Sequence, residues 1–114
     1  MKKTTIDSNK LAAHMMSAVR SGIIRRYPSS REYAAAEFQK IADSIAFIHR
    51  QHRDGRMTDE QARLHLDIQK TASRMVLLTL EGLGILAVED AINQALAAVR
   101  ATVNKALGFS LIEP

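Results

Sequence analysis

The chain has 114 residues, no cysteine and a formal net charge of +4. Without cysteine it cannot form disulfides, bind metals through thiolates or use a thiolate nucleophile. Its apolar fraction of 46% excludes a disordered chain, so we expect one domain with a mainly aliphatic core.

No segment has the length and composition of a targeting or membrane-spanning helix. Polar residues 7–10 interrupt the region where the apolar part of a signal peptide would stand. The most apolar stretch, residues 75–88, contains Glu81 and is shorter than the roughly 20 residues that span a bilayer. We therefore expect a cytoplasmic protein.

The positive charge is concentrated before residue 32. Seven basic residues stand there against one acidic residue, whereas the remainder has nine basic and eleven acidic residues. Such a segment can neutralise the phosphates of nucleic acid or of anionic lipid. The residues predicted to contact an anionic partner are Lys10, Arg20, Arg25, Arg26 and Arg31.

The first predicted element is a basic helix over residues 8–26, within a basic helix and arm that occupy residues 1–28. Its apolar residues Leu11, Met15, Val19 and Ile23 recur every four positions, and Asp7 or Ser8 is a suitable N-cap. Pro28 ends this pattern.

The second predicted helix begins at Ser29, which forms the capping-box pattern with Glu32. Its apolar positions follow the 3.5-residue spacing of a coiled-coil-like seam; they are Ala34, Phe38, Ile41, Ile45, Ile48 and His52. Asp54-Gly55 then marks a turn, and Thr58 with Gln61 repeats the capping box. The short connection predicts an antiparallel helical hairpin within residues 29–107.

Residues 59–107 contain neither proline nor a polar loop, which predicts either one long C-terminal helix or two helices broken near Gly82–Gly84. We prefer one long helix, continuous or kinked at these glycines. Such a helix would rise about 73 Å, roughly twice the length of the helix before it. The uncovered apolar half predicts a homo-oligomer, most simply a dimer. The expected interface consists of Met75, Leu78, Gly82, Ile85, Ile92, Leu96 and Val99. Gly108 predicts the helix end, and residues 108–114 an apolar tail that docks.

Two groups of residues could carry chemistry. His49, His52 and His65 could meet at the closed end of the hairpin as weak metal-ligand candidates, but neighbouring arginines favour solvated histidines. Glu81 is either a buried functional carboxylate or, as we prefer, part of a polar stripe. No nucleotide-binding, nucleophile or metalloprotease motif occurs. We therefore expect that the chain is not an enzyme and that it binds no cofactor and no small-molecule substrate.

The fold class predicted is therefore all-α, a single helical domain over residues 1–114 that assembles as an oligomeric bundle. The functional hypothesis is a non-enzymatic oligomerisation or adaptor protein whose basic N-terminal helix contacts a partner. A nucleic-acid-binding accessory protein and a peripheral membrane or pore-associated protein are the alternatives.

Overall fold

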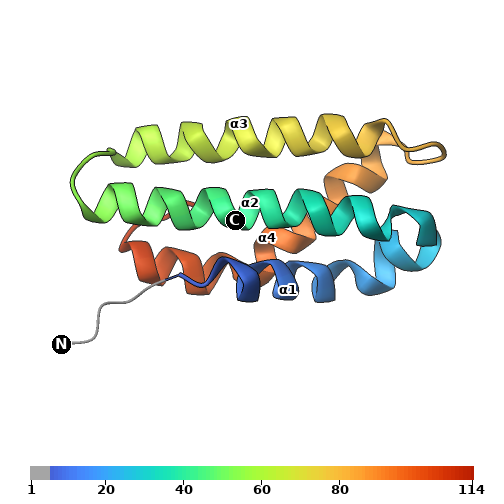
Figure 1. Ribbon diagram of the computed structural model, residues 1–114, viewed down its shortest axis with the longest axis horizontal. Helices are drawn as coiled ribbons and strands as arrows, with labels where there is room; N and C mark the ends of the chain where they lie inside the picture. The colour runs from blue at the N-terminus through green and yellow to red at the C-terminus, as the bar shows by residue number, and fades with distance from the viewer. Residues whose placement is uncertain (1–5) are drawn as a thin grey trace.

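The computed structural model describes residues 6–114 and shows an all-helical fold (Figure 1). Lys2 and Lys3 of the predicted basic arm lie outside the described residues. The described part contains four packed α-helices and no strand, which confirms the all-α class. They are α1 (Ser8–Val19), α2 (Arg31–Arg53), α3 (Asp59–Leu78) and α4 (Ile85–Leu107), with a π-helical segment η1 (Arg20–Ile24) and a 3-10 turn η2 (Pro28–Ser30) between α1 and α2.

The N-terminal helix forms where its apolar spacing predicts. The Asp7 carboxylate caps α1 by accepting hydrogen bonds from the backbone N–H groups of Asn9 and Lys10. The helix continues through η1 to residue 26, and Leu11, Met15, Val19 and Ile23 are buried along one side. The predicted stripe therefore faces the core.

The predicted capping box at Ser29 is wrong. Pro28 starts the 3-10 turn, and Ser30 has a helical backbone without a side-chain cap bond. An N-cap residue needs an extended backbone for its side chain to reach back to the first turn. Here the Ser30 hydroxyl instead donates to the Tyr27 carbonyl oxygen at 2.6 Å. This hydrogen bond between Ser30 and Tyr27 stabilises the 3-10 turn.

Helices α2 and α3 lie side by side and run in opposite directions (Figure 1). Five of the six predicted seam positions of α2 are buried, and His52 is half-buried. The capping box of Thr58 and Gln61 is present at the start of α3, with both side-chain-to-backbone hydrogen bonds formed. This cap fixes where the chain re-enters a helix after the loop.

The preferred prediction of one long helix over residues 59–107 is wrong, and the alternative of two helices broken near Gly82–Gly84 is correct. The longest dimension of the chain is 46 Å, shorter than the about 73 Å such a helix would need. Helix α3 ends at Leu78, Gly82 adopts a left-handed backbone with φ of 88°, and Gly84 caps α4. Because α4 turns back here, it crosses behind α2 toward α1 (Figure 1).

This turn lets α4 complete the core within one chain. Its apolar face is buried against α1, α2 and α3; the buried residues are Val88, Ala91, Ile92, Ala95, Leu96, Val99, Val103 and Leu107. Turning back buries this face within one chain, whereas a straight continuation would extend beyond α2 and leave it exposed to water. The apolar length that predicted a second subunit is therefore covered internally.

The C-terminal tail docks as predicted. Gly108 ends α4 in a left-handed conformation with φ of 80°. The Asn104 side chain then accepts from the backbone N–H groups of Leu111 and Ile112 and donates to the Ile112 carbonyl, each at 3.0 Å. Leu111 and Ile112 are buried, so the tail belongs to the core.

Candidate functional site

Helix α3 has a second apolar face that points away from the core. Leu64, Ile68 and Met75 are 60%, 63% and 64% exposed, and at 100° per residue they lie within about 40° of one another around the helix axis. The inward face of the same helix is buried and consists of Ala62, Leu66, Ser73 and Leu77. A helix that packs on one side only needs one apolar stripe, so the outward face has no packing role within a single chain.

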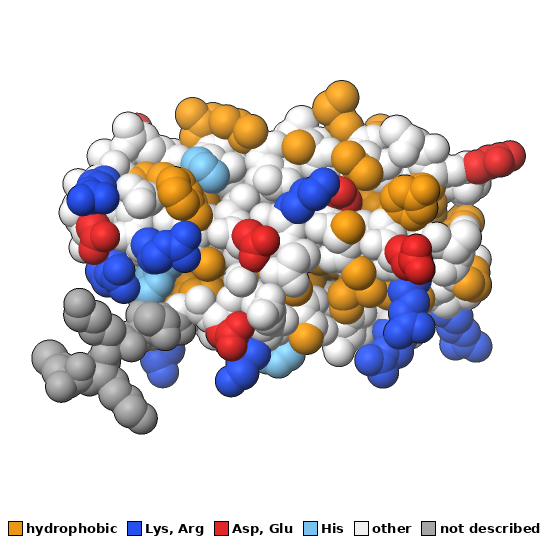
Figure 2. All heavy atoms as spheres, in the orientation of Figure 1, with side chains coloured by type: hydrophobic (Ala, Val, Ile, Leu, Met, Phe, Trp, Pro, Cys, Tyr) orange, Lys and Arg blue, Asp and Glu red, His pale blue; other side chains and the backbone are white. Residues whose placement is uncertain are grey.

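This outward apolar face lies at an edge of the molecule. Figure 2 shows hydrophobic side chains along the upper border, where α3 lies in Figure 1. Charged residues flank the face on the side toward α4, where Asp67 is exposed and Arg74 forms an ion pair with Glu89. An apolar centre with a charged border is the usual composition of a protein-binding surface.

The predicted oligomer-interface residues separate into two groups. Met75, Gly82 and Ile85 are exposed and Leu78 is half-buried. Ile92, Leu96 and Val99 are buried in the core of the single chain, because α4 packs back onto the other helices. The candidate surface is therefore on α3 and excludes the middle of α4.

Sequence reasoning missed Leu64 and Ile68, two of the three exposed apolar side chains of this face. A signal was present: Leu64, Ile68 and Met75 are spaced by four and seven residues, and Ala62, Leu66, Ser73 and Leu77 repeat the same spacing two residues out of phase. Two such stripes in one helix indicate two covered faces.

The predicted anionic-partner residues also separate in space. Arg20, Arg25, Arg26 and Arg31 are exposed near the junction of α1 and α2, and none of them forms an ion pair within residues 6–114. Figure 2 shows Lys and Arg side chains gathered at this end. We call these four residues the arginine cluster.

Lys10 lies ten residues before Arg20, the nearest member of the arginine cluster, which corresponds to about 15 Å along a helix. It lines a hollow of about 570 Å³ between α1 and α4, together with His14 and Lys105.

Within the described residues, no helix combines the length and the apolar character needed to cross a membrane.

The three candidate histidines make separate contacts. His52 lies 2.7 Å from an Asp59 carboxylate oxygen, and its ring centre is 4.6 Å from that of Phe109. The His65 ring stacks on Phe47 at 5.3 Å, and His49 is buried. Within residues 6–114 no group of three or more metal-binding side chains is close enough to hold an ion.

His49 is expected to make the stability of the chain depend on pH. Burial lowers the pKa of this imidazole, and the positive charges of Arg53, His52 and Arg50 lower it further. In the unfolded chain the pKa of His49 returns to about 6.5. Between that pH and the lower pKa of the folded state, the imidazole is therefore protonated in the unfolded chain and neutral in the folded chain. The free energy of unfolding is expected to fall as pH decreases from about 6.5 toward the folded-state pKa. Urea unfolding of the wild type and His49→Leu measures this, and an equal pH dependence in both would contradict it.

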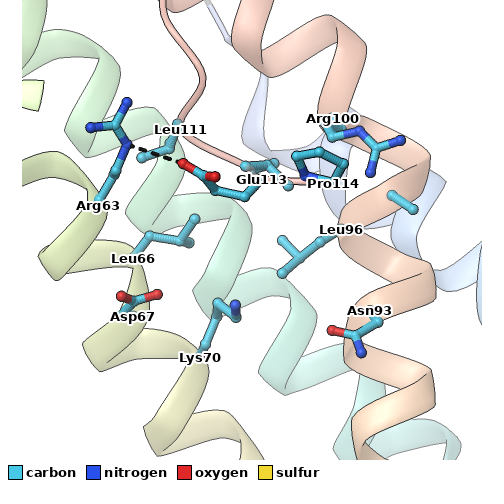
Figure 3. A pocket seen from close by; sticks show the side chains of 12 residues that line it. Arg63, Leu66, Asp67, Lys70, Asn93, Leu96, Arg100, Leu111, Glu113 and Pro114 are labelled. Carbon is cyan, nitrogen blue, oxygen red and sulfur yellow. Dashed lines mark ion pairs between the residues drawn. The ribbon is translucent and has the colours of Figure 1, made fainter.

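A groove of about 630 Å³ lies between α3 and α4, where the two helices diverge (Figure 3). Leu66 and Leu96 lie on either side of it, and the tail residues Leu111 and Pro114 border it. Arg63 holds the tail there: its Nε atom donates to the Ser110 carbonyl at 3.1 Å and lies 3.6 Å from the Glu113 carboxylate. The chain's own tail thus forms one wall of the groove.

Two carboxylates have environments that the sequence did not settle. Glu81 is exposed, so it is not a buried functional carboxylate, but it lies in the connection between α3 and α4 and not on the polar stripe of a helix. Glu37 is buried in α2, where the Lys40 ammonium lies 2.9 Å from its carboxylate. The lysine neutralises the buried charge, which makes Glu37 part of the structural core of α2.

The chain matches no family model, and neither the curated proteins nor the solved structures contain a significant match to it.

Proposed function

We propose that this chain is a non-enzymatic assembly protein, in which copies associate through the outward face of α3 and the arginine cluster contacts an anionic partner. The observation that supports self-association is the exposure of Leu64, Ile68 and Met75 on a helix whose other face is buried. Apolar surface of this kind gains free energy when a second surface covers it.

The size of that gain favours a weak dimer. Full burial of one large aliphatic side chain contributes about 1.5–3 kcal/mol. Because these three side chains are already partly buried, six of them in a symmetric pair would contribute roughly 5–11 kcal/mol. Association costs about 4–15 kcal/mol in lost motional freedom. At the favourable ends of both ranges the net gain is about 7 kcal/mol, which corresponds to a dissociation constant of about 10 µM. We therefore expect a dimer no tighter than that, which dissociates on dilution.

Methyl NMR spectra recorded over a range of protein concentrations test this proposal. The methyl resonances of Leu64, Ile68 and Met75 should shift as the concentration rises, because these groups enter the interface. The methyl groups of Met15 and Ile45, which are buried in the core, are the internal control and should not move. Stationary resonances at all five positions would contradict self-association through α3.

The arginine cluster supports the second part of the proposal. Exposed guanidinium groups without an internal carboxylate partner are free to bind phosphate oxygens, which they contact through paired N–H donors. The four side chains come from a short stretch around the Tyr27–Pro28 turn, so they can contact neighbouring phosphates. Duplex DNA at low salt and vesicles containing anionic lipid distinguish a nucleic acid from a membrane surface as the source of the phosphate.

Reversing two charges tests the arginine cluster. Arg25→Glu combined with Arg26→Glu is expected to weaken binding of the phosphate-bearing partner. If that partner is DNA, the slope of log affinity against log salt should become shallower by about two, since each lost phosphate contact removes about 0.9. Arg50→Glu combined with Arg56→Glu makes the same net charge change at the other end of α2 and is the matched control. Equal losses in both double variants would show that only net charge matters.

A further inference from the structure

The outward face of α3 has the spacing of a coiled-coil seam. Leu64, Ile68, Thr71, Met75 and Leu78 follow steps of four, three, four and three residues, the pattern that lets two helices interlock along their length. The first four lie directly opposite the buried face of α3, so the bundle does not obstruct them. A second helix of the same kind can therefore lie along the whole face.

A second copy of α3 fits this face in the antiparallel direction. A two-fold axis between Gln69 and Lys70 places Leu64 of one copy against Met75 of the other. Ile68 then lies against Thr71 of the second copy, in the middle of the contact. Leu64, Ile68 and Met75 each meet an apolar side chain or a small one, and the two copies use the same surface, as a two-fold dimer requires.

The charges beside the seam favour the antiparallel over the parallel direction. Asp67 and Arg74 lie seven residues apart on the same flank of α3. In the antiparallel pair Asp67 of each copy faces Arg74 of the other, which gives two opposite-charge contacts. In a parallel pair this flank faces the opposite flank of the second helix, where Ala72 stands near Asp67. Such a pair would gain no charge contact from Asp67.

The internal contact of Arg74 is compatible with this role. The carboxylate of Glu89 on α4 holds the Arg74 side chain beside the seam, and that side chain remains 27% exposed. A guanidinium group has five N–H donors, so it can serve Glu89 and an Asp67 carboxylate from a second copy. The ion pair within the chain therefore positions the group for a contact between chains.

We propose that two copies of this chain pair through α3 in an antiparallel register, with Leu64 of one copy against Met75 of the other and Asp67 against Arg74. This inference rests on the proposed self-association and adds its geometry.

Cysteine cross-linking tests the register on a chain that has no cysteine of its own. Leu64→Cys and Met75→Cys proteins are mixed in equal amounts and oxidised, with Ala13→Cys on α1 as the exposed control. A disulfide needs Cα atoms about 4.4–6.8 Å apart. In the antiparallel register residues 64 and 75 meet, whereas the two residues 64 are about 16 Å apart along the helix. The mixed disulfide should therefore greatly exceed the half expected from random pairing.

The outcomes separate the register from the self-association. A dominant disulfide between two copies of the Leu64→Cys protein would overturn the antiparallel direction. If the wild-type protein sediments as a dimer, a random mixture of disulfides between the two cysteine variants, or no disulfide, would overturn the register alone. A wild-type protein that remains monomeric would overturn the proposed function as well.

A charge substitution that leaves the apolar face intact provides a second test of the contact between Asp67 and Arg74. Asp67→Arg places an arginine against Arg74 of the second copy, so the dimer dissociation constant should rise at least about tenfold. Ala13→Arg, on α1, adds a positive charge away from α3 and should leave the constant within about twofold. Equal dissociation constants for the two variants would contradict the contact between Asp67 and Arg74.

Discussion

Ile68→Asp is expected to raise the dimer dissociation constant at least about 100-fold, while the single chain remains folded. Ile68 is exposed in one chain, so its replacement leaves the core unchanged. In the dimer it lies at the centre of the contact, and the variant would desolvate two carboxylates in place of two apolar side chains. The loss of burial and the desolvation together cost about 3 kcal/mol or more, which corresponds to the factor of 100.

Sedimentation equilibrium measures this effect, and circular dichroism confirms that the variant is folded. Ala13→Asp is the matched control, because Ala13 is exposed on α1 at the opposite edge of the molecule from α3 (Figure 1). The control should associate like the wild type. An Ile68→Asp variant that dimerises with unchanged affinity would place the contact elsewhere.

Phe38→Ala is expected to lower the free energy of unfolding by about 3–5 kcal/mol. Phe38 is completely buried at the centre of the α2 seam, and the other helices cannot collapse fully into the space that its ring leaves. A loss of this size is a large part of the about 5–15 kcal/mol that stabilises a typical small domain. Urea unfolding followed by circular dichroism measures the change.

Phe47→Ala removes the same side chain from the same helix and serves as its control. Phe47 is partly exposed, and its one aromatic partner is the His65 ring at 5.3 Å. The expected loss is about 2 kcal/mol, because the variant loses the partial burial of the ring as well as the aromatic contact. Equal losses at positions 38 and 47 would mean that the α2 seam does not lie in the core.

The local signals in the sequence were sufficient for most of the helix ends. Asp7, the pair Thr58 and Gln61, and Gly108 act at the predicted ends because capping depends on residues within one turn of one another. The Ser29 box was wrong because Pro28 sets the backbone of the two residues after it. A pattern of residue types does not include this backbone constraint.

The local sequence did not decide whether the chain breaks between α3 and α4. Residues 79–84 continue the apolar pattern, and a glycine in a helix costs only about 1 kcal/mol. What favours the break is distant in sequence: the apolar face of α4 gains its burial from α1 and α2. The helix propensities of residues 79–84 do not include this free energy of burial against helices distant in sequence.

The candidate site was predicted in part for the same reason. Met75 and Ile85 are exposed as an interface requires, whereas Ile92, Leu96 and Val99 are buried by the turn at Gly82. Once the direction of α4 is known, the unsatisfied apolar surface moves to Leu64 and Ile68. The surface available for assembly thus depends on how the chain completes its own core.

Sedimentation equilibrium of the unmodified chain, over concentrations from low to high micromolar, measures self-association without any substitution. The average mass should rise with concentration from 12.6 kDa toward twice that value, since the α3 faces of two chains cover each other. A mass that stays at 12.6 kDa over the whole range, in a protein shown to be folded, would contradict association through α3.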